Sequence, residues 1–454
     1  MRFTASLILA VVLACGALAF ADATSGLFST QQPMALQLRA PFDDLFAKSG
    51  HDPAYAVDGS IAYTAADGHI IHIDGVRISV RGNSSKQESE CTFPKLKLRL
   101  APSAAREASP FRGVAALKIG THCGEAPGEE LTHKFGRLAN ERAPLREAFV
   151  YQLLAIMDVP SLEARPARIT YEDSGRTGPP LVRNAMLLED TGAARKRLGL
   201  GAEITMARFG SADADLTAAD TAALALAEAM IGNFDWCIRF TDGDTYRCDA
   251  SKPLWNILAF KRDGDRALPV MHDFDLAGMV TGSHFWFDRV LNERFSASSS
   301  RTEVEVVSQV QHTRTLFARA DLDAARRRFV PHHDEAFAAL RASGVDPRGR
   351  EIIAAYLDAF FAAIATDEAF YRPVIVETTT AYAEADGSTP ACANAAAAPA
   401  GTPVGPPLDR RAGRVQVQLL DALWHWTGPR ACGAIRRGPV WIDRGAIGTG
   451  FPVR

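Results

Sequence analysis

The chain has 454 residues, a formal net charge of −3 at pH 7 and a 47% share of hydrophobic residues. This length is enough for a large core and for two or three domains. The nearly balanced charge excludes a long-range attraction to nucleic acid or to an anionic membrane. We therefore expect no nucleic-acid partner and look for function in local motifs.

The N-terminus predicts export. Arg2 precedes an apolar run at 7–14, and Ala19 and Ala21 then form the A-x-A pattern of a signal-peptidase site. The run is shorter than the roughly 20 apolar residues that span a bilayer. We expect residues 1–21 to be a signal peptide and the mature protein to be periplasmic or extracellular, without a transmembrane span. An imperfect lipobox at 12–15 leaves a lipoprotein anchored at Cys15 as the alternative.

Cysteine usage agrees with an oxidising compartment. Without Cys15 the chain keeps six cysteines, an even number that permits three disulfides. They are Cys91, Cys123, Cys237, Cys248, Cys392 and Cys432. Their spacing does not match a zinc site.

A segment rich in Ala, Pro, Gly, Ser and Thr at 386–407 divides the chain. Nothing in it could bury a face, so it predicts a linker or a long loop. The main predicted domain, 22–372, precedes it. The clearest elements of this domain are half-buried strands at 71–80 and 96–100 and buried helices at 144–157, 217–231 and 351–366.

Residues 373–454 contain this linker and three short β-type runs. The runs lie at 414–420, 423–426 and 438–442 and are separated by Gly and Pro, which predicts a small all-β barrel. The tryptophan-bearing run followed by a G-P-V-W-I run resembles a bacterial SH3-like module.

The most distinctive motif is His272-Asp273-Phe274-Asp275, which follows an apolar run at 268–271. In an extended chain both carboxylates face one way, while Phe274 points into the core. Mg²⁺ prefers one or two carboxylates, with phosphate oxygens and waters as its remaining ligands. The alternative is a solvated acidic turn after a strand.

A second acidic motif, Asn233-Phe234-Asp235-Trp236, follows the predicted helix at 217–231 and its stop at Gly232. Asp235 lies between two aromatic residues, where an idle charge is costly. A catalytic base or a metal ligand would justify the charge. The alternative is that Asp235 caps the next turn.

Basic residues share one face of the strand at 96–100. Lys95, Lys97 and Arg99 lie opposite the leucines, which is also typical of a solvated strand face. Glu147 lies in the helix at 144–157, both faces of which are expected to be buried. A buried carboxylate needs a cation, and a strand lysine would provide one.

The order of these parts is that of a protein kinase: strand lysine, helix glutamate, Asp235, then Asn256 and Asp273. A kinase uses these parts to hold phosphates, orient a hydroxyl and bind Mg²⁺. The chain resembles the spore-coat protein H (CotH) kinase family and related exported bacterial proteins. The resemblance covers about 71–279 and is carried by segments 80–85 (V-R-G-N-S-S), 93–98, 117–123, 146–151, 187–190, 231–236, 256–257 and 272–278.

The resemblance implies an α+β fold: an atypical, two-lobed kinase-like domain, here followed by the SH3-like barrel. It also implies ATP and Mg²⁺ (or Mn²⁺) as cofactors. The residue roles that it implies are as follows: Asp235 as base; Lys97, with Lys95 or Lys118 as alternatives, as the phosphate-binding lysine; Glu147 as its partner; Asp273, Asn256 and Asp275 at the metal; and Glu189 at the adenine hinge. Arg81 and Ser84 in the R-G-N-S-S turn either cover phosphates or cap the strand.

The sequence departs from the kinase pattern at one place. A kinase has its Asn about five residues after the catalytic Asp, whereas here Asn256 is 256 − 235 = 21 residues after Asp235. The intervening residues 237–248 predict a hairpin closed by Cys237 and Cys248. If this hairpin does not bring Asp235 and Asn256 together, the domain is a pseudokinase. The other expected pairs are Cys91 with Cys123 and Cys392 with Cys432.

Two main functions follow. The first is an exported enzyme that transfers the γ-phosphoryl group of ATP to a hydroxyl of an envelope or secreted protein. The second is an inactive envelope scaffold that binds a partner or peptidoglycan through its SH3-like module. Whether the chain is an enzyme stays open, because free ATP is scarce outside the cytoplasm. A third hypothesis is a calcium-stabilised adhesin that uses Asp242, Asp244 and the Asp273 pair.

Overall fold

The structure is a computed structural model that describes residues 26–65, 67–205, 215–239, 252–262, 266–284 and 300–371, together with two short strands at 414–416 and 441–443. The predicted signal peptide, Cys15, the linker, Asp242, Asp244, Cys248, Cys392 and Cys432 lie outside these residues.

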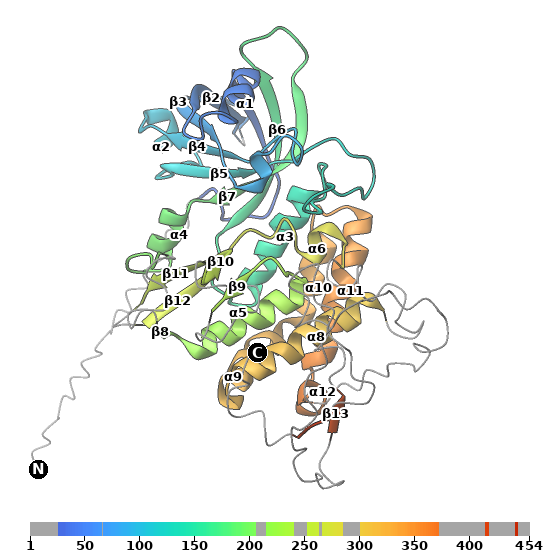
Figure 1. The fold of residues 1–454 in the computed structure, drawn as a ribbon. Coiled ribbons are helices and arrows are strands. Elements are labelled where there is room, and N and C mark those ends of the chain that lie inside the picture. The colour runs from blue at the N-terminus through green and yellow to red at the C-terminus, as the bar shows by residue number, and fades with distance from the viewer. Residues whose placement is uncertain are drawn as a thin grey trace, which may run out of the picture.

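A closed barrel of seven strands forms the main sheet, at one end of the molecule (Figure 1). Around the barrel the strands follow the order β1-β2-β3-β4-β5-β7-β6. Strands β1 and β6 pair in parallel, from Met34 opposite Ala167 to Ala40 opposite Asp173, and this pair closes the sheet. The strands are β1 (Met34–Ala40), β2 (Ala56–Thr64), β3 (Ile70–Val80), β4 (Leu96–Leu100), β5 (Ala116–Gly120), β6 (Ala164–Asp173) and β7 (Leu181–Glu189).

Alternating side chains explain the barrel interior. In β1, Met34, Leu36, Leu38 and Ala40 are buried and the residues between them are exposed, as expected for a strand with one face on a core. These side chains join one apolar cluster with residues of the other strands, among them Ile73. The barrel is therefore filled by its own side chains, as small barrels are.

The predicted fold class, an α+β two-lobed kinase-like domain followed by an SH3-like barrel, is wrong. The main sheet is a closed barrel with mixed pairing. The closing strand β1 lies before the first segment of the resemblance. Its parallel pairing with β6, more than a hundred residues later in the sequence, leaves no periodic trace in the sequence, because periodicity reports only which face of a strand is buried.

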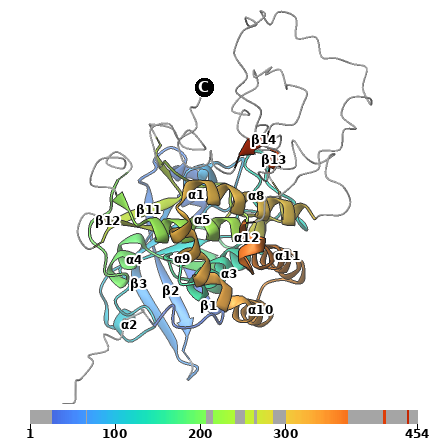
Figure 2. The same ribbon diagram turned by 90° about the horizontal axis from the view of Figure 1, so that it is seen from below.

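Helices and two small sheets make up most of the rest of the described residues up to 371. Figure 2 shows α5, α8 and α9 from below, in front of the barrel strands. The longer helices are α3 (Ala143–Ile156), α5 (Ala218–Ile231), α8 (Arg301–Leu316), α9 (Arg319–Phe329), α10 (His333–Ala342) and α11 (Pro347–Ile364). The shorter ones are α1 (Phe42–Ser49), α2 (Ala104–Glu107), α4 (Thr191–Arg197), α6 (Gly278–Thr281) and α12 (Asp367–Tyr371). The small sheets have the orders β11-β12-β8 and β10-β9, with β8 (Asp215–Leu216), β9 (Cys237–Ile238), β10 (Leu254–Trp255), β11 (Ile257–Lys261) and β12 (Arg266–Met271).

A second apolar cluster joins α3, α5, α8, α9 and α11 beneath the barrel. Helix α5 is rich in Ala and Leu and is buried on nearly every side, as expected for a central helix. It ends at Gly232, whose φ of 63° is left-handed, the conformation that glycine adopts without steric cost. This stop places the following turn, with Asp235, at the end of a rigid helix.

Several predicted elements are confirmed. The strands expected at 71–80 and 96–100 are β3 and β4, and the three expected helices are α3, α5 and α11. In the C-terminal segment the structure describes one antiparallel pair, β13 (Arg414–Gln416) and β14 (Trp441–Asp443); the rest of the predicted barrel lies outside the described residues.

The predicted bond between Cys91 and Cys123 is present, with an S–S distance of 2.00 Å. Cys237 is also disulfide-bonded. Disulfides of this kind agree with an exported protein. Within the described residues, no helix is both long enough and apolar enough to cross a membrane.

Candidate functional site

Lys95, which directly precedes β4, binds both carboxylates of the Asp-Phe-Asp motif. Its Nζ lies 2.6 Å from Asp273 Oδ1 and 2.9 Å from Asp275 Oδ2, and its residue is 7% exposed. Burial opposes the charge of Lys95, but Asp273, Asp275 and Glu147 together raise its pKa above the ordinary value. The lysine is therefore held charged among three acids at the junction of the barrel and the helices.

The Asp-Phe-Asp motif forms a turn at the end of β12. Asp273 has a φ of 67°, a left-handed conformation that Asp tolerates better than most residues. Its backbone N–H donates to Tyr151 Oη at 3.1 Å, and Phe274, fully buried as predicted, packs on the ring of Tyr151. Burial favours the neutral acid, but Lys95, His272 and Arg81 together outweigh it, so the pKa of Asp273 lies below its usual range.

Glu147 lies in α3 beneath this turn. Its Oε1 accepts a hydrogen bond from the backbone N–H of Phe274 at 3.3 Å. Burial raises the pKa of Glu147 to about 7, and the charge of Lys95 opposes this rise. Glu147 therefore neighbours Lys95, while the ion pairs of Lys95 go to Asp273 and Asp275.

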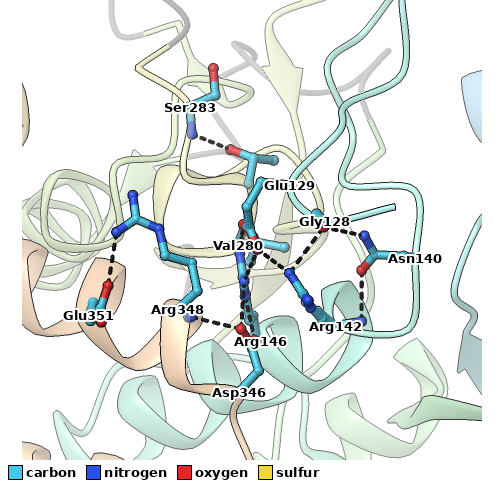
Figure 3. Close-up of polar contacts among 12 residues, drawn as sticks. Gly128, Glu129, Asn140, Arg142, Arg146, Val280, Ser283, Asp346, Arg348 and Glu351 are labelled. Atoms are coloured by element: carbon cyan, nitrogen blue, oxygen red, sulfur yellow. Dashed lines mark hydrogen bonds and ion pairs between the residues drawn. The ribbon is translucent and has the colours of Figure 1, made fainter. Parts of the chain in front are cut away.

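The preceding residue, Arg146, fixes α3 in place (Figure 3). Its guanidinium binds Asp346 through Nε and Nη2 at 2.9 and 3.0 Å, and Glu129 through Nη1 and Nη2 at 2.8 and 2.9 Å. Nη1 also donates to the carbonyl of Val280 in α6 at 3.1 Å. One fully buried side chain thus ties α3, α6, the start of α11 and the segment 124–142 together.

Asp235 and Asn256 meet in space despite their separation in sequence. The Asn256 amide donates to the carbonyl oxygen and to Oδ2 of Asp235 at 2.6 and 2.9 Å, and the Trp255 indole donates to Oδ1 at 2.9 Å. The antiparallel pair of β9 and β10, with Cys237 opposite Trp255, closes the gap. Burial is the main cause that raises the pKa of Asp235, and the nearby charges of Asp275 and Asp273 add to it.

The other two predicted lysines lie further from the acids. Lys97 pairs with Asp190 at 2.8 Å, and Lys118 donates to Thr191 Oγ1 at 2.9 Å. Burial, followed by the charge of Arg81, lowers the pKa of Lys118 to about 8. Of the three candidates, Lys95 is the one that contacts Asp273.

Two of the remaining predicted site residues, Glu189 and Arg81, differ in how far their side chains are already bound within the protein. Glu189 is buried against Arg197, 2.8 Å away, and accepts the N–H of Glu163, so its side chain is engaged within the protein. Arg81 instead has a buried Nε without a hydrogen-bond partner. Its charge also acts on Lys95, Lys118, His272 and Asp273, which places Arg81 near the acids.

Arg137 and Tyr151 are site residues that the sequence motifs did not reveal. Arg137 Nε binds Asp275 Oδ2 at 2.7 Å, and its Nη2 donates to Ser84 Oγ at 2.7 Å. It thereby joins the R-G-N-S-S turn to the Asp-Phe-Asp motif. No periodicity marks Arg137, since it lies in a loop. Tyr151 is four residues after Glu147 and so on the same helix face, a relation that the sequence itself contains.

The carboxylates at the site fit a metal ion that binds together with phosphate groups. Asp273, with a side chain 36% exposed, presents a carboxylate, and Mg²⁺ needs only one or two from the protein. Asp275 is held by Arg137. Over the part of the chain that the structure describes, there is no group of three His, Cys, Asp or Glu side chains that could hold a metal alone.

The site also fits an anion. In the described residues Arg81 and Lys118 have no carboxylate in an ion pair, and the pKa of Lys118 is lowered first by burial and then by the positive charge of Arg81. A phosphate would compensate these positive charges and supply the missing acceptor for Arg81 Nε.

No family model matches the chain, and no curated protein matches it either. Among solved structures, the Helicobacter pylori proinflammatory kinase CtkA is similar to it at 9% sequence identity and a TM-score of 0.34, over 62% of this chain and 92% of that chain.

Proposed function

We propose that the protein is an exported phosphotransferase. It transfers the γ-phosphoryl group of ATP, with Mg²⁺ or Mn²⁺, to a hydroxyl of an envelope or secreted protein. The observation that carries the proposal is the meeting of two pairs from distant segments: Lys95 with Asp273, and Asp235 with Asn256. Phosphoryl transfer requires little more of a protein than placed cations, a metal ligand and a group to orient the hydroxyl.

Each residue has a distinct role in this proposal. Arg81 and Lys118 hold phosphate oxygens, and Lys95 takes the role that the resemblance first gave to Lys97. Asp273 and Asn256 hold the metal, which when bound neutralises charge on the phosphates. Arg137 keeps Asp275 in place.

Asp235 acts on the acceptor. Its raised pKa suits a group that takes up a proton, and hydrogen bonds from Trp255 and Asn256 orient its carboxylate. The acceptor oxygen bonds to the γ-phosphorus, and the bond from that phosphorus to the bridging oxygen breaks. The hydroxyl proton goes to Asp235, and nucleoside diphosphate leaves.

The test is transfer of labelled phosphate from ATP by the mature protein with Mg²⁺ or Mn²⁺. Asp235→Asn and Asp273→Asn should each lower the rate at least ~100-fold, because each removes a group required in the transition state. The control is Asp74→Asn, which changes an exposed carboxylate of β3. Equal transfer by all four proteins would contradict the proposal. Nucleotide binding without transfer would favour the inactive scaffold.

A matched lysine pair tests the choice of Lys95. Lys95→Met should abolish transfer, whereas Lys97→Met, which removes a lysine of the same strand face paired with Asp190, should retain most of it. The opposite result would assign the role to Lys97.

A further inference from the structure

We propose that Tyr356 of α11 is a positioning residue. It sets the spacing between the Asp235 turn (residues 232–236) and the Asp273 turn (residues 272–278). The inference rests on the proposed function, since it concerns the two turns that bear the catalytic and metal-binding acids.

The ring of Tyr356 fills the space that side chains would occupy on both turns. It is fully buried. A Cβ added to Gly278 would overlap the Tyr356 hydroxyl, and one added to Gly232 would overlap the ring carbon Cε1. The two glycines are also joined directly, because Gly278 N donates to Gly232 O at 2.9 Å. Both turns therefore touch one side chain and each other.

Tyr356 belongs to a continuous contact of α11 with the segment after the Asp273 turn. Residues 349, 352 and 356 follow the three-to-four-residue repeat of one helix face. Gly349 lies against Arg146, with only 2.5 Å between an added Cβ and Arg146 Nε, and Ile352 lies against Gly282. The same Arg146 holds the carbonyl of Val280. Over two helical turns, α11 therefore packs against α6 and against the Asp273 turn.

The hydroxyl of Tyr356 fixes the position of its ring relative to the two turns. Tyr356 Oη donates to Glu305 Oε2 of α8 at 3.0 Å, and the His284 ring stacks on Tyr356 at 6.1 Å between centroids. Because the hydroxyl is anchored, the ring cannot slide along the two glycine backbones.

The acids lie close to these contacts in sequence. Asp235 is three residues after Gly232, and Asp275 is three residues before Gly278. A shift of one turn against the other changes the distance between Asp235 and Asp273. A displacement of about 1 Å in a catalytic group can cost on the order of 100-fold in rate.

The experiment follows the Trp255 indole N–H, which donates to Asp235. The full-length protein is labelled with ¹⁵N on its six tryptophans, and W255F identifies the resonance. The variants are G278A, G232A and Y356F, with each glycine change also made in the Y356F background. G344A is the control, since an added Cβ there meets nothing within 4 Å. The melting temperature of every variant is measured in parallel.

We expect G278A to shift the Trp255 resonance and lower the melting temperature, and Y356F to reverse part of both effects, because the hydroxyl is the nearest atom in the way, while ring carbon Cζ, 2.5 Å from the added Cβ, remains. Y356F should not rescue G232A, where a ring carbon is in the way and φ is 63°. A lower melting temperature of G278A without a shift of the Trp255 resonance would overturn the inference. Equal rescue of G278A and G232A by Y356F would also overturn it. The readout needs no catalysis, so an inactive protein would refute the proposed function and leave this test intact.

Discussion

The barrel and the helical part bury different kinds of side chain. The fully buried residues of the barrel strands are apolar, such as Ile73, Ile78 and Leu117. The helical part has its own apolar cluster and, in addition, fully buries the charged residues Arg146 and Glu305. Apolar packing tolerates many arrangements, whereas buried charges are stable only when each meets its partner. We infer that the apolar packing of the barrel contributes stability alone, whereas the buried charges of the helical part contribute stability and also specify where the acid-bearing turns lie.

The largest expected effect comes from Arg146→Met. This change leaves Asp346 without the cation that it binds, and Glu129 with Arg142 as its remaining one. Breaking one partner of a buried ion pair typically costs about 3–5 kcal/mol, so the free energy of unfolding should fall by that amount in urea denaturation. The Trp255 indole resonance should also shift, since α6 loses its anchor at Val280. A loss below about 1 kcal/mol would show that the helical part does not depend on this network.

A barrel substitution should affect stability alone. Leu38→Ala removes a buried side chain of β1 that faces the apolar cluster, and such changes cost about 3 kcal/mol. Since Leu38 belongs to the barrel cluster and not to the cluster beneath it, the Trp255 resonance of the folded protein should stay in place. A shifted resonance would mean that the barrel also controls the site.

Glu147 should make stability depend on pH. Burial raises its pKa from 4.5 to about 7 in the folded protein, so the folded state binds more protons than the unfolded state between these values. Its contribution is fully present below about pH 4.5 and is lost as the pH rises through about 7, by at most about 3 kcal/mol. Glu147→Gln should flatten the slope measured by urea denaturation. The exposed Glu88→Gln is the control, and an unchanged slope in Glu147→Gln would assign the pH dependence to other groups.

Periodicity predicted the local elements because the residues of one buried face recur at a fixed spacing within a single segment. It gave β3, β4, α3, α5 and α11 with boundaries close to those of the structure. It missed the closure of the barrel, which depends on the parallel pairing of β1 with β6, and this pairing is invisible in either strand alone.

The site was partly predictable for the same reason. Lys95, Lys97 and Arg99 share one strand face, so alternation cannot tell them apart. What separates them is that the start of β4 lies beside the end of β12, which brings Lys95 to Asp273. Arg137 lies in a loop and became recognisable only through its contact with Asp275. Asp235 and Asn256 were named from motifs, but their contact depends on the pairing of β9 with β10.

The smallest expected effect is that of Arg77→Met. It tests whether burial is the reason that breaking an ion pair is costly in the helical part and not in the barrel. Arg77 of β3 pairs with Asp58 of β2 at 3.2 Å, and the two side chains are 51% and 83% exposed. Arg146 makes the same kind of pair with Asp346 but is fully buried. Water screens the exposed pair and solvates Asp58 when its partner is removed, so Arg77→Met should change the free energy of unfolding by about 0.5 kcal/mol or less. High salt should weaken the effect of Arg77→Met further and leave that of Arg146→Met nearly unchanged, because buried pairs are screened much less. Equal losses in the two variants would show that the barrel also relies on its ion pairs, and the proposed division between the two regions would fail.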